Sequence, residues 1–326
     1  MGLLQETCDA IHSRSKEIEQ HIIKNWNDAS DSKQYGRLVN MVAQYGAATN
    51  QKDVTIPKPC MIIASADHGV ADMGVSAYPK ETTVGMTQNY LIPKGAGANS
   101  LANYCGAHME VIDMGIDADM SWVPGLRSHK LGMGTKNFVE EPAMTREQAI
   151  EGIETGIKLV QEKMADGYNV FLVGEMGISN TTASALMTAK FAGLTAEEAT
   201  GRGTNISDER LKLKQRIVHD VLVKYKDIPK DDAIGILAAV GGFEFTCIVG
   251  VILGAAAHHG MVIIDGFNTS ACALVAKTLV PASMDYVMAS HLSAEKAAKS
   301  SLQNLGLEAY VDLGLCLGEA SGGSVQ

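Results

Sequence analysis

The sequence predicts an α/β protein whose mostly parallel sheet is covered by helices on both faces. Four short apolar runs, each ending in or followed by Gly or Asp, are typical of strands: "CMIIASA", "MEVIDMG", "YNVFLVG" and "GMVIIDG". Each run leads into a loop or a helix pattern, which is the alternation that βαβ units show. The composition, with 46% hydrophobic and 20% charged residues, is that of a globular protein with a large buried core.

The chain before the first strand is predicted to be helical. Apolar residues recur there near helical spacing, at Ile11, Ile18, Ile22 and Trp26. A polar link, "NQKDVTIPKPC", then separates these helices from the first strand. After the last of the four strands, a helix pattern and the segment "LEAYVDLGL" lead to a glycine-rich stretch, "LGLCLGEASGGS".

Composition and spacing exclude several classes of function. The net charge of −10 repels the phosphates of nucleic acids. The longest apolar segment, "CIVGVILGAAA", is shorter than the roughly 20 residues of a membrane-spanning helix. The six cysteines lack CxxC or CxH spacing, so buried thiols are expected rather than metal ligands. No signal peptide is recognised at the start, and we expect the protein in the cytoplasm.

Ligands of parallel sheets gather at the carboxyl ends of the strands, which draws attention to the turn "VGEMGISNTTASAL". Gly174 and Gly177 permit tight backbone geometry there, and Asn180, Thr181 and Thr182 are expected to cap the next helix. Free N–H groups and the helix dipole make such a start an anion site. A plain glycine turn is the alternative, and phosphate binding is slightly favoured. The P-loop and GxGxxG patterns are absent, which disfavours ATP and dinucleotides.

A second glycine turn, "GRGTNISDERLKLKQRIV", repeats this pattern. Gly201 and Gly203 make a flexible turn, and Ser207 is expected to cap the helix that follows. Lys212 or Lys214 would reach back to an anion near the turn, although a lysine on a helix is usually solvated.

Two carboxylates stand in unusual surroundings. Glu175 adjoins the expected phosphate, so its side chain is expected to face a ribose hydroxyl or a developing positive charge, or else solvent. Glu319 lies among Gly, Ala, Ser and Leu. In a poorly hydrated pocket its pKa would rise and suit a general acid or base, whereas on a surface loop it would have no such role. The pair Asp67–His68 after the first strand suits loop orientation as well as chemistry.

Seven motifs occur in order along the chain: "ADHGVADMGVSAYPKETT", "GEMGISNTTASA", "GRGTNISDERLKLK", "AAVGGFEF", "IIDGFNTSACALVA", "SHLSAEKAA" and "LGLCLGEASGG". Together they resemble the motifs of the nicotinate-nucleotide–dimethylbenzimidazole phosphoribosyltransferase (CobT) family. The resemblance spans nearly all of the chain from about residue 35. It implies a large Rossmann-like domain at 49–289 that holds the nucleotide and base sites. It also implies a small helical domain formed by 1–48 with about 290–326.

The resemblance implies a reaction and a set of site residues. The phosphoribosyl group of nicotinate mononucleotide would move, with inversion, to a cobamide lower-ligand base such as 5,6-dimethylbenzimidazole, with no metal or other cofactor. Glu319 would be the catalytic base, and Asp67, Tyr78 and Met86 would lie near the base pocket. The nucleotide and its phosphate would contact Glu175, Gly177, Ser179, Asn180, Thr181, Thr182, Gly201, Arg202, Gly203, Thr204 and Lys214. A homodimer is expected.

Departures from the family pattern leave alternatives open. Gly85 stands where many members carry Gln, and Ser179 and Asn205 stand where Gly is common. The sequence also runs only to Gln326, without the helix that usually follows the last motif. A less polar pocket would suit phenol or p-cresol as the acceptor, in a heterodimer of two family-like chains. A non-catalytic partner subunit of such a heterodimer is the other alternative, although Glu319, Glu175 and Lys214 together speak against it.

Overall fold

The computed structural model describes residues 2–29, 32–315 and 317–325. Its centre is a sheet of six strands in the order β3-β2-β1-β4-β5-β6, and every pairing is parallel. The predicted α/β class with a parallel sheet is therefore confirmed. The strands are β1 (Pro59–Ala66), β2 (His108–Gly115), β3 (Arg127–Ser128), β4 (Val170–Met176), β5 (Met261–Ile264) and β6 (Val287–Ala289).

The four predicted strands are β1, β2, β4 and β5, and the two edge strands were not predicted. β3 and β6 have two and three residues, which is too short for any apolar pattern to appear in the sequence. The chain builds outward from β1 to β2 on one side and then from β4 to β5 on the other. The point between β1 and β4 is thus a topological switch point, where α/β proteins bind ligands.

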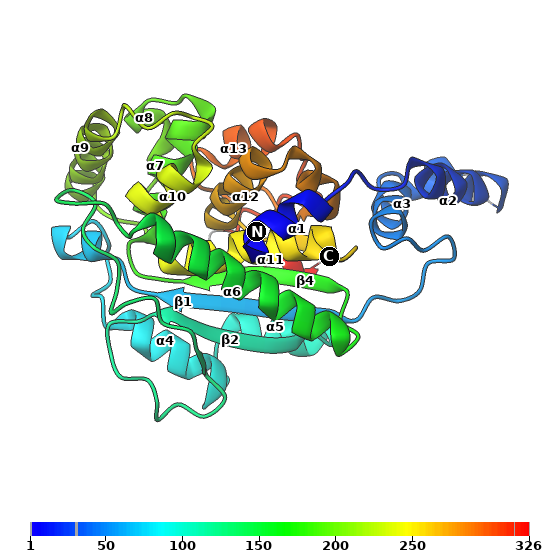
Figure 1. Ribbon diagram of the computed structural model, residues 1–326, viewed down its shortest axis with the longest axis horizontal. Coiled ribbons are helices and arrows are strands. Elements are labelled where there is room, and N and C mark those ends of the chain that lie inside the picture. The colour runs from blue at the N-terminus through cyan, green and yellow to red at the C-terminus, as the bar shows by residue number, and fades with distance from the viewer. Residues whose placement is uncertain (1, 30–31, 316, 326) are drawn as a thin grey trace.

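Helices cover both faces of the sheet (Figure 1). On one face α11 (Phe243–Ala257) packs on β1, β2, β4 and β5, and α6 (Arg146–Ala165) packs on α11. On the other face α4 (Thr82–Leu91) and α5 (Gly97–Cys105) contact the sheet. The remaining helices of this body are α7 (Asn180–Ala192), α8 (Ala196–Ala199), α9 (Asp208–Lys224), α10 (Ala233–Val240) and α12 (Phe267–Leu279).

The N-terminal helices do not form one unit. α1 (Leu3–Ala10) packs on α6 and α11, whereas α2 (Lys16–Ala29) and α3 (Leu38–Ala48) pack on each other and project from the body (Figure 1). Their small separate core consists of Ile18, Ile22, Ala43 and Ala47.

The segment from about 290 contacts both the body and this projection. α13 (Ala298–Leu305) packs on α12 and α7, while the Arg37 guanidinium donates to the Ala309 carbonyl (2.9 Å) and lies over the Tyr310 ring. The division into a small domain, formed by 1–48 with about 290–326, and a large domain at 49–289 stays a prediction.

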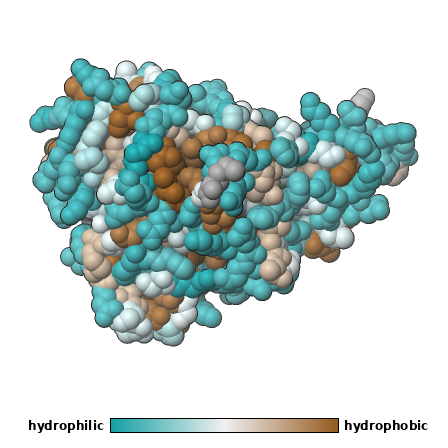
Figure 2. All heavy atoms as spheres, viewed as in Figure 1, coloured by the Kyte–Doolittle hydropathy of each residue, from teal (hydrophilic) through white to brown (hydrophobic). Residues whose placement is uncertain are grey.

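Figure 2 shows one face of the molecule mostly covered by hydrophilic side chains, with apolar residues gathered near its middle. Within the described ranges, no helix combines the length and the apolar character that crossing a membrane requires. Cys60, Cys247 and Cys272 are buried thiols, as predicted, whereas Cys8 and Cys105 are half-buried. Cys316 lies outside the described residues.

Candidate active site

Residues 318–324, here called the strap, lie directly against strand β4. A Cβ atom on Gly174 would stand 2.3 Å from the backbone nitrogen of Ala320, so only glycine allows this approach. Glu319 and Ala320 both have φ of 61°, in the left-handed region. Each such non-glycine residue costs about 1–3 kcal/mol, and persists only where its surroundings hold it. The strap is therefore a strained and firmly held turn.

The opposite side of the strap is held by the carboxyl end of β5 and by His291. The Gly322 amide donates to Oδ1 of Asp265 (2.6 Å). A Cβ atom on Gly322 would lie 1.9 Å from Nδ1 of His291, so the strap backbone packs closely on that ring. Burial raises the pKa of Asp265 to about 7, although the strap amides lower it.

Glu319 is buried in this turn, with 9% of its surface exposed. Desolvation raises the pKa of its carboxyl group, and the nearby Tyr90 hydroxyl offsets only part of that shift. The interpretation of Glu319 as a surface decoration is thus wrong. A carboxylate with a raised pKa at the switch point has the properties of a general base.

Glu175, at the end of β4, is also buried. Burial raises its pKa to about 8, and the nearby carboxylates of Glu244 and Asp265 raise it further, while amide hydrogen bonds lower it. The Asn180 amide donates to Oε2 of Glu175, and the Asn268 amide donates to Oδ1 of Asn180 (3.0 Å). A carboxyl group with this pKa is mostly protonated at pH 7, so it can face a ribose hydroxyl beside a phosphate without strong repulsion.

The turn before α7 differs from the prediction that Asn180, Thr181 and Thr182 cap the helix. The N-cap residue is Ser179, which has φ of 78° and makes no side-chain cap hydrogen bond. The Asn180 side chain instead binds Glu175, and Thr181 accepts from Lys214. Among the described residues, the buried hydroxyls of Ser179 and Thr182 have no partner. Such atoms cost free energy unless a water, an ion or a ligand satisfies them.

Lys214 reaches this turn from α9. Its ammonium donates to Oγ1 of Thr181 (2.7 Å), and a Cβ atom on Gly203 would lie 3.3 Å from its Nζ. The side chain is 2% exposed, and burial lowers its pKa to about 8 against the attraction of Glu295. The same Glu295 accepts from the Gly203 amide (2.8 Å). A nearly buried cation beside a helix start is suited to an anionic substrate group.

The other residues of the second glycine turn, at 201–204, differ in what they contact. Gly201 packs closely on Glu295, and Thr204 accepts from the Ala77 amide (2.9 Å), which ties this turn to the loop that follows β1. Arg202 instead binds within its own loop, through Asp208 and the Ile206 carbonyl (2.7 Å). The structure thus brings Gly201, Gly203 and Thr204 toward the site and directs the Arg202 side chain away from it. Ser207 caps α9 through the Arg210 amide, as predicted.

The three residues predicted for the base pocket lie in different environments. Asp67 is buried after β1, where its Oδ2 accepts from the Asp117 amide (2.9 Å) and burial raises its pKa. Met86 is half-buried on α4 and packs against the core. Tyr78 is exposed. The α4 helix itself touches the turn before α7, because Thr83 accepts from the Ile178 amide (3.2 Å).

Sequence reasoning missed two features of the site. Nε2 of His68 lies 2.6 Å from Oε1 of Glu244, both side chains are fully buried, and the ring lies against Gly177. Asp265 was the other omission, although its place directly after the apolar run "MVII" was a usable signal. Asp67–His68 thus combines a buried acid at the strand end with a histidine that packs on the turn before α7.

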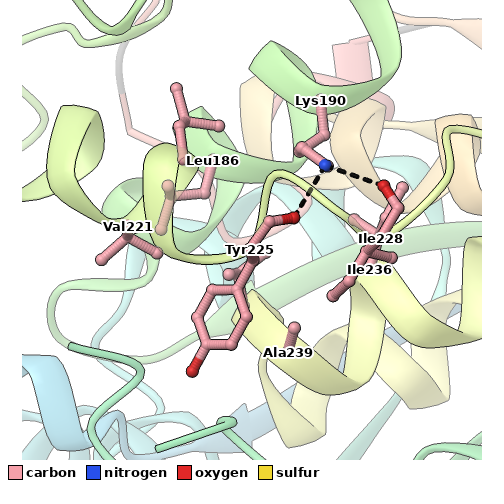
Figure 3. A pocket seen from close by; sticks show the side chains of 9 residues that line it. Leu186, Lys190, Val221, Tyr225, Ile228, Ile236 and Ala239 are labelled. Carbon is pink, nitrogen blue, oxygen red and sulfur yellow. Dashed lines mark hydrogen bonds between the residues drawn. The ribbon is translucent and has the colours of Figure 1, made fainter. Parts of the chain in front are cut away.

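Two concave features of the surface lie elsewhere. A small cavity of about 10 Å³ lies between α7, α9 and α10. Its lining includes Lys190, which donates to the carbonyls of Tyr225 and Ile228 (2.9 Å each; Figure 3). This lysine binds the backbone at the end of α9, whereas Lys214 donates to a side chain of the turn before α7. A groove of about 270 Å³, lined in part by Arg127, His129 and Glu162, contains none of the predicted site residues.

Comparisons with known proteins agree with this geometry. The family model DBI_PRT, described as phosphoribosyltransferase, matches residues 11–326. The nicotinate-nucleotide–dimethylbenzimidazole phosphoribosyltransferase of Geobacter metallireducens is 43% identical over 290 residues, which cover 89% of this chain and 82% of that protein. Its counterpart in Chloroflexus aggregans is 42% identical over 287 residues, covering 88% and 81%.

A solved structure gives the same answer. The crystal structure of CobT from Thermus thermophilus superposes with a TM-score of 0.89 at 32% identity, covering 95% of this chain and 92% of that one. These matches confirm the resemblance that the seven motifs indicated. The chain belongs to the nicotinate-nucleotide–dimethylbenzimidazole phosphoribosyltransferase family.

Proposed function

We propose that this protein transfers the phosphoribosyl group of nicotinate mononucleotide to 5,6-dimethylbenzimidazole or a similar aromatic base. The products are α-ribazole 5′-phosphate and nicotinate, with inversion at the anomeric carbon. The family assignment and the placement of Glu319, Glu175 and Lys214 around one switch point support this function.

The step balances without any added reagent. The bond from the anomeric carbon to the pyridinium nitrogen breaks, and its electron pair returns to the ring as nicotinate leaves. The lone pair of one benzimidazole nitrogen forms the new bond from the opposite face. The proton on the other nitrogen passes to Glu319, which also stabilises positive charge on the attacking ring.

The remaining site residues are proposed to hold the donor. Lys214 and the free hydroxyls of Ser179 and Thr182 would bind its anionic groups, and Glu175 would face the ribose. Holding both reactants in line supplies much of the rate enhancement in a displacement of this kind.

The observation that carries the proposal is the burial of Glu319 in the strap, directly against β4. We expect Glu319→Gln to lower kcat by roughly 10²–10⁴, the usual loss for a general base, with the fold intact. Release of nicotinate from nicotinate mononucleotide and dimethylbenzimidazole measures this. Glu308→Gln is the matched control, since that side chain is 82% exposed. Normal turnover by the Glu319 variant would contradict the assignment.

The identity of the acceptor base and the oligomeric state are further parts of the proposal. We propose dimethylbenzimidazole as the preferred acceptor, and a competition among dimethylbenzimidazole, adenine, phenol and p-cresol would decide this. Preference for a phenol would favour the alternative acceptor class. We also propose a homodimer, which light scattering of the purified protein tests. Activity that requires a second, different chain would favour the heterodimer instead.

A further inference from the structure

We propose that Asp265 is a positioning residue that holds the strap and thereby sets the place of the Glu319 carboxylate. This inference rests on the proposed function, because it assigns Asp265 a role in the same reaction. Asp265 does not need to touch either substrate for this role.

The geometry starts from the carboxyl end of β5. Asp265 follows this strand directly, is 3% exposed, and is anchored where its carbonyl accepts from the Ser290 hydroxyl (3.0 Å). Its Oδ1 accepts from the Gly322 amide at 2.6 Å. The amides of Ala320 and Gly323 face the same carboxylate. One side chain thus gathers N–H groups from the residues that come immediately after Glu319.

The strap needs such an anchor because its backbone is strained. Glu319 and Ala320 are both left-handed, and neither is glycine, so this conformation must be imposed from outside. Gly174 blocks movement on one side and His291 on the other, but both of these contacts are steric. Asp265 supplies a directional contact from outside the strap, since its carboxylate accepts the Gly322 amide and so fixes the orientation of that amide.

Three substitutions distinguish the effect of where the Asp265 side chain lies from the effect of its charge. Asp265→Asn keeps the length and one acceptor oxygen, Asp265→Glu keeps the charge but is one methylene longer, and Asp265→Ala removes the contact. We expect Asn to retain kcat within about tenfold and Glu and Ala to lose about 100-fold, since a misplacement of about 1 Å can cost this much. KM for nicotinate mononucleotide should change by less than about threefold in all three, because the donor is held by other residues.

A readout other than activity makes the test independent of the reaction. In Asp265→Ala, hydrogen exchange of the amides in 318–324 should accelerate by about tenfold or more, with little change in the rest of the sheet. The control is Asp312→Asn, because Asp312 also accepts an amide of the C-terminal segment, from Gly314 (3.4 Å), but is exposed. We expect wild-type kcat and wild-type exchange in that variant.

The outcomes are distinguishable. Retention by Glu with loss by Asn would show that the charge acts in the chemistry and would overturn the proposal, as would normal kcat and exchange in all three variants. If Asp265→Ala fails to fold, the Asn and Glu pair still decides. If the wild-type protein does not release nicotinate, the proposed function fails, whereas hydrogen exchange still tests whether Asp265 holds the strap.

Discussion

Two regions of this protein, the crossing of α6 on α11 and the strap on β4, both depend on missing Cβ atoms but serve different ends. A Cβ on Gly156 would stand 2.1 Å from the Cys247 carbonyl, and one on Gly174 would stand 2.3 Å from the Ala320 nitrogen. At the crossing the neighbouring hydroxyl of Thr246 is satisfied by the Phe243 carbonyl (2.6 Å). Around the strap, several buried polar atoms have no partner within the described residues, among them Oδ2 of Asp265 and Oγ of Ser321.

The difference shows that close glycine packing alone does not mark a functional site. Both regions exclude water and bring backbones into contact. Among the described residues of these two regions, the strap and its neighbours add buried carboxylates with raised pKa values. They also add polar atoms without partners, which cost free energy unless a ligand or water satisfies them. We therefore expect changes at the two regions to affect different measurements.

Among the changes that compare these two regions, Gly174→Ala should have the largest effect, and that effect is on catalysis. The added methyl group would push the Ala320 backbone away and move Glu319 with it, so kcat should fall about 100-fold. Steady-state kinetics measures this on protein whose circular dichroism spectrum matches the wild type. A variant that keeps wild-type kcat would show that the strap tolerates displacement and would remove the distinction drawn here.

The next effect concerns the buried charge of Lys214. Its pKa is lowered to about 8 by burial, so the free protein holds the ammonium below pH 8 and loses it above. If only the ammonium form binds the anionic donor, KM for nicotinate mononucleotide should be flat below about pH 7.5. It should then rise toward about tenfold per pH unit above pH 8.

Kinetics from about pH 6.5 to about pH 9.5 test this dependence, since that range spans the titration of the ammonium. Lys214→Met should raise KM throughout and remove the dependence, whereas Lys212→Met, at an exposed position of the same helix, should leave both unchanged. A wild-type KM that does not vary with pH would argue against Lys214 as the anion-binding group.

The smallest effect on activity, but a clear one on stability, is expected from Gly156→Ala. Overpacking the crossing should lower the free energy of unfolding by about 1–3 kcal/mol while kcat per folded molecule stays the same. Urea denaturation measures the change. Gly85→Ala is the control, because no atom lies within 4 Å of its added Cβ on α4, and a gain of about 0.5–1 kcal/mol is expected there. A loss of kcat per folded molecule in Gly156→Ala would contradict the distinction between a structural crossing and a functional strap.

Much of the fold was predictable because short apolar runs that end at Gly or Asp are typical of strands. Glu175, Lys214 and Glu319 were also singled out, since they follow strands, helix starts or glycine turns. The pairing of His68 with Glu244 and of Gly322 with Asp265 was not predictable, because these contacts join residues 176 and 57 positions apart. The cap before α7 was predicted wrongly, because the Asn180 side chain binds Glu175 and the Thr181 hydroxyl binds Lys214 instead of the helix backbone.

The left-handed alanine at 320 has a consequence for engineering. Glycine would adopt this conformation without steric strain, so a search for thermostable variants could select it where that relief exceeds the entropy that glycine loses on folding. The methyl group of Ala320 is fully buried against Gly174, however, and its removal would loosen the turn that carries the carboxylate. At position 320, selection for heat resistance should therefore favour glycine, whereas selection for turnover should favour alanine.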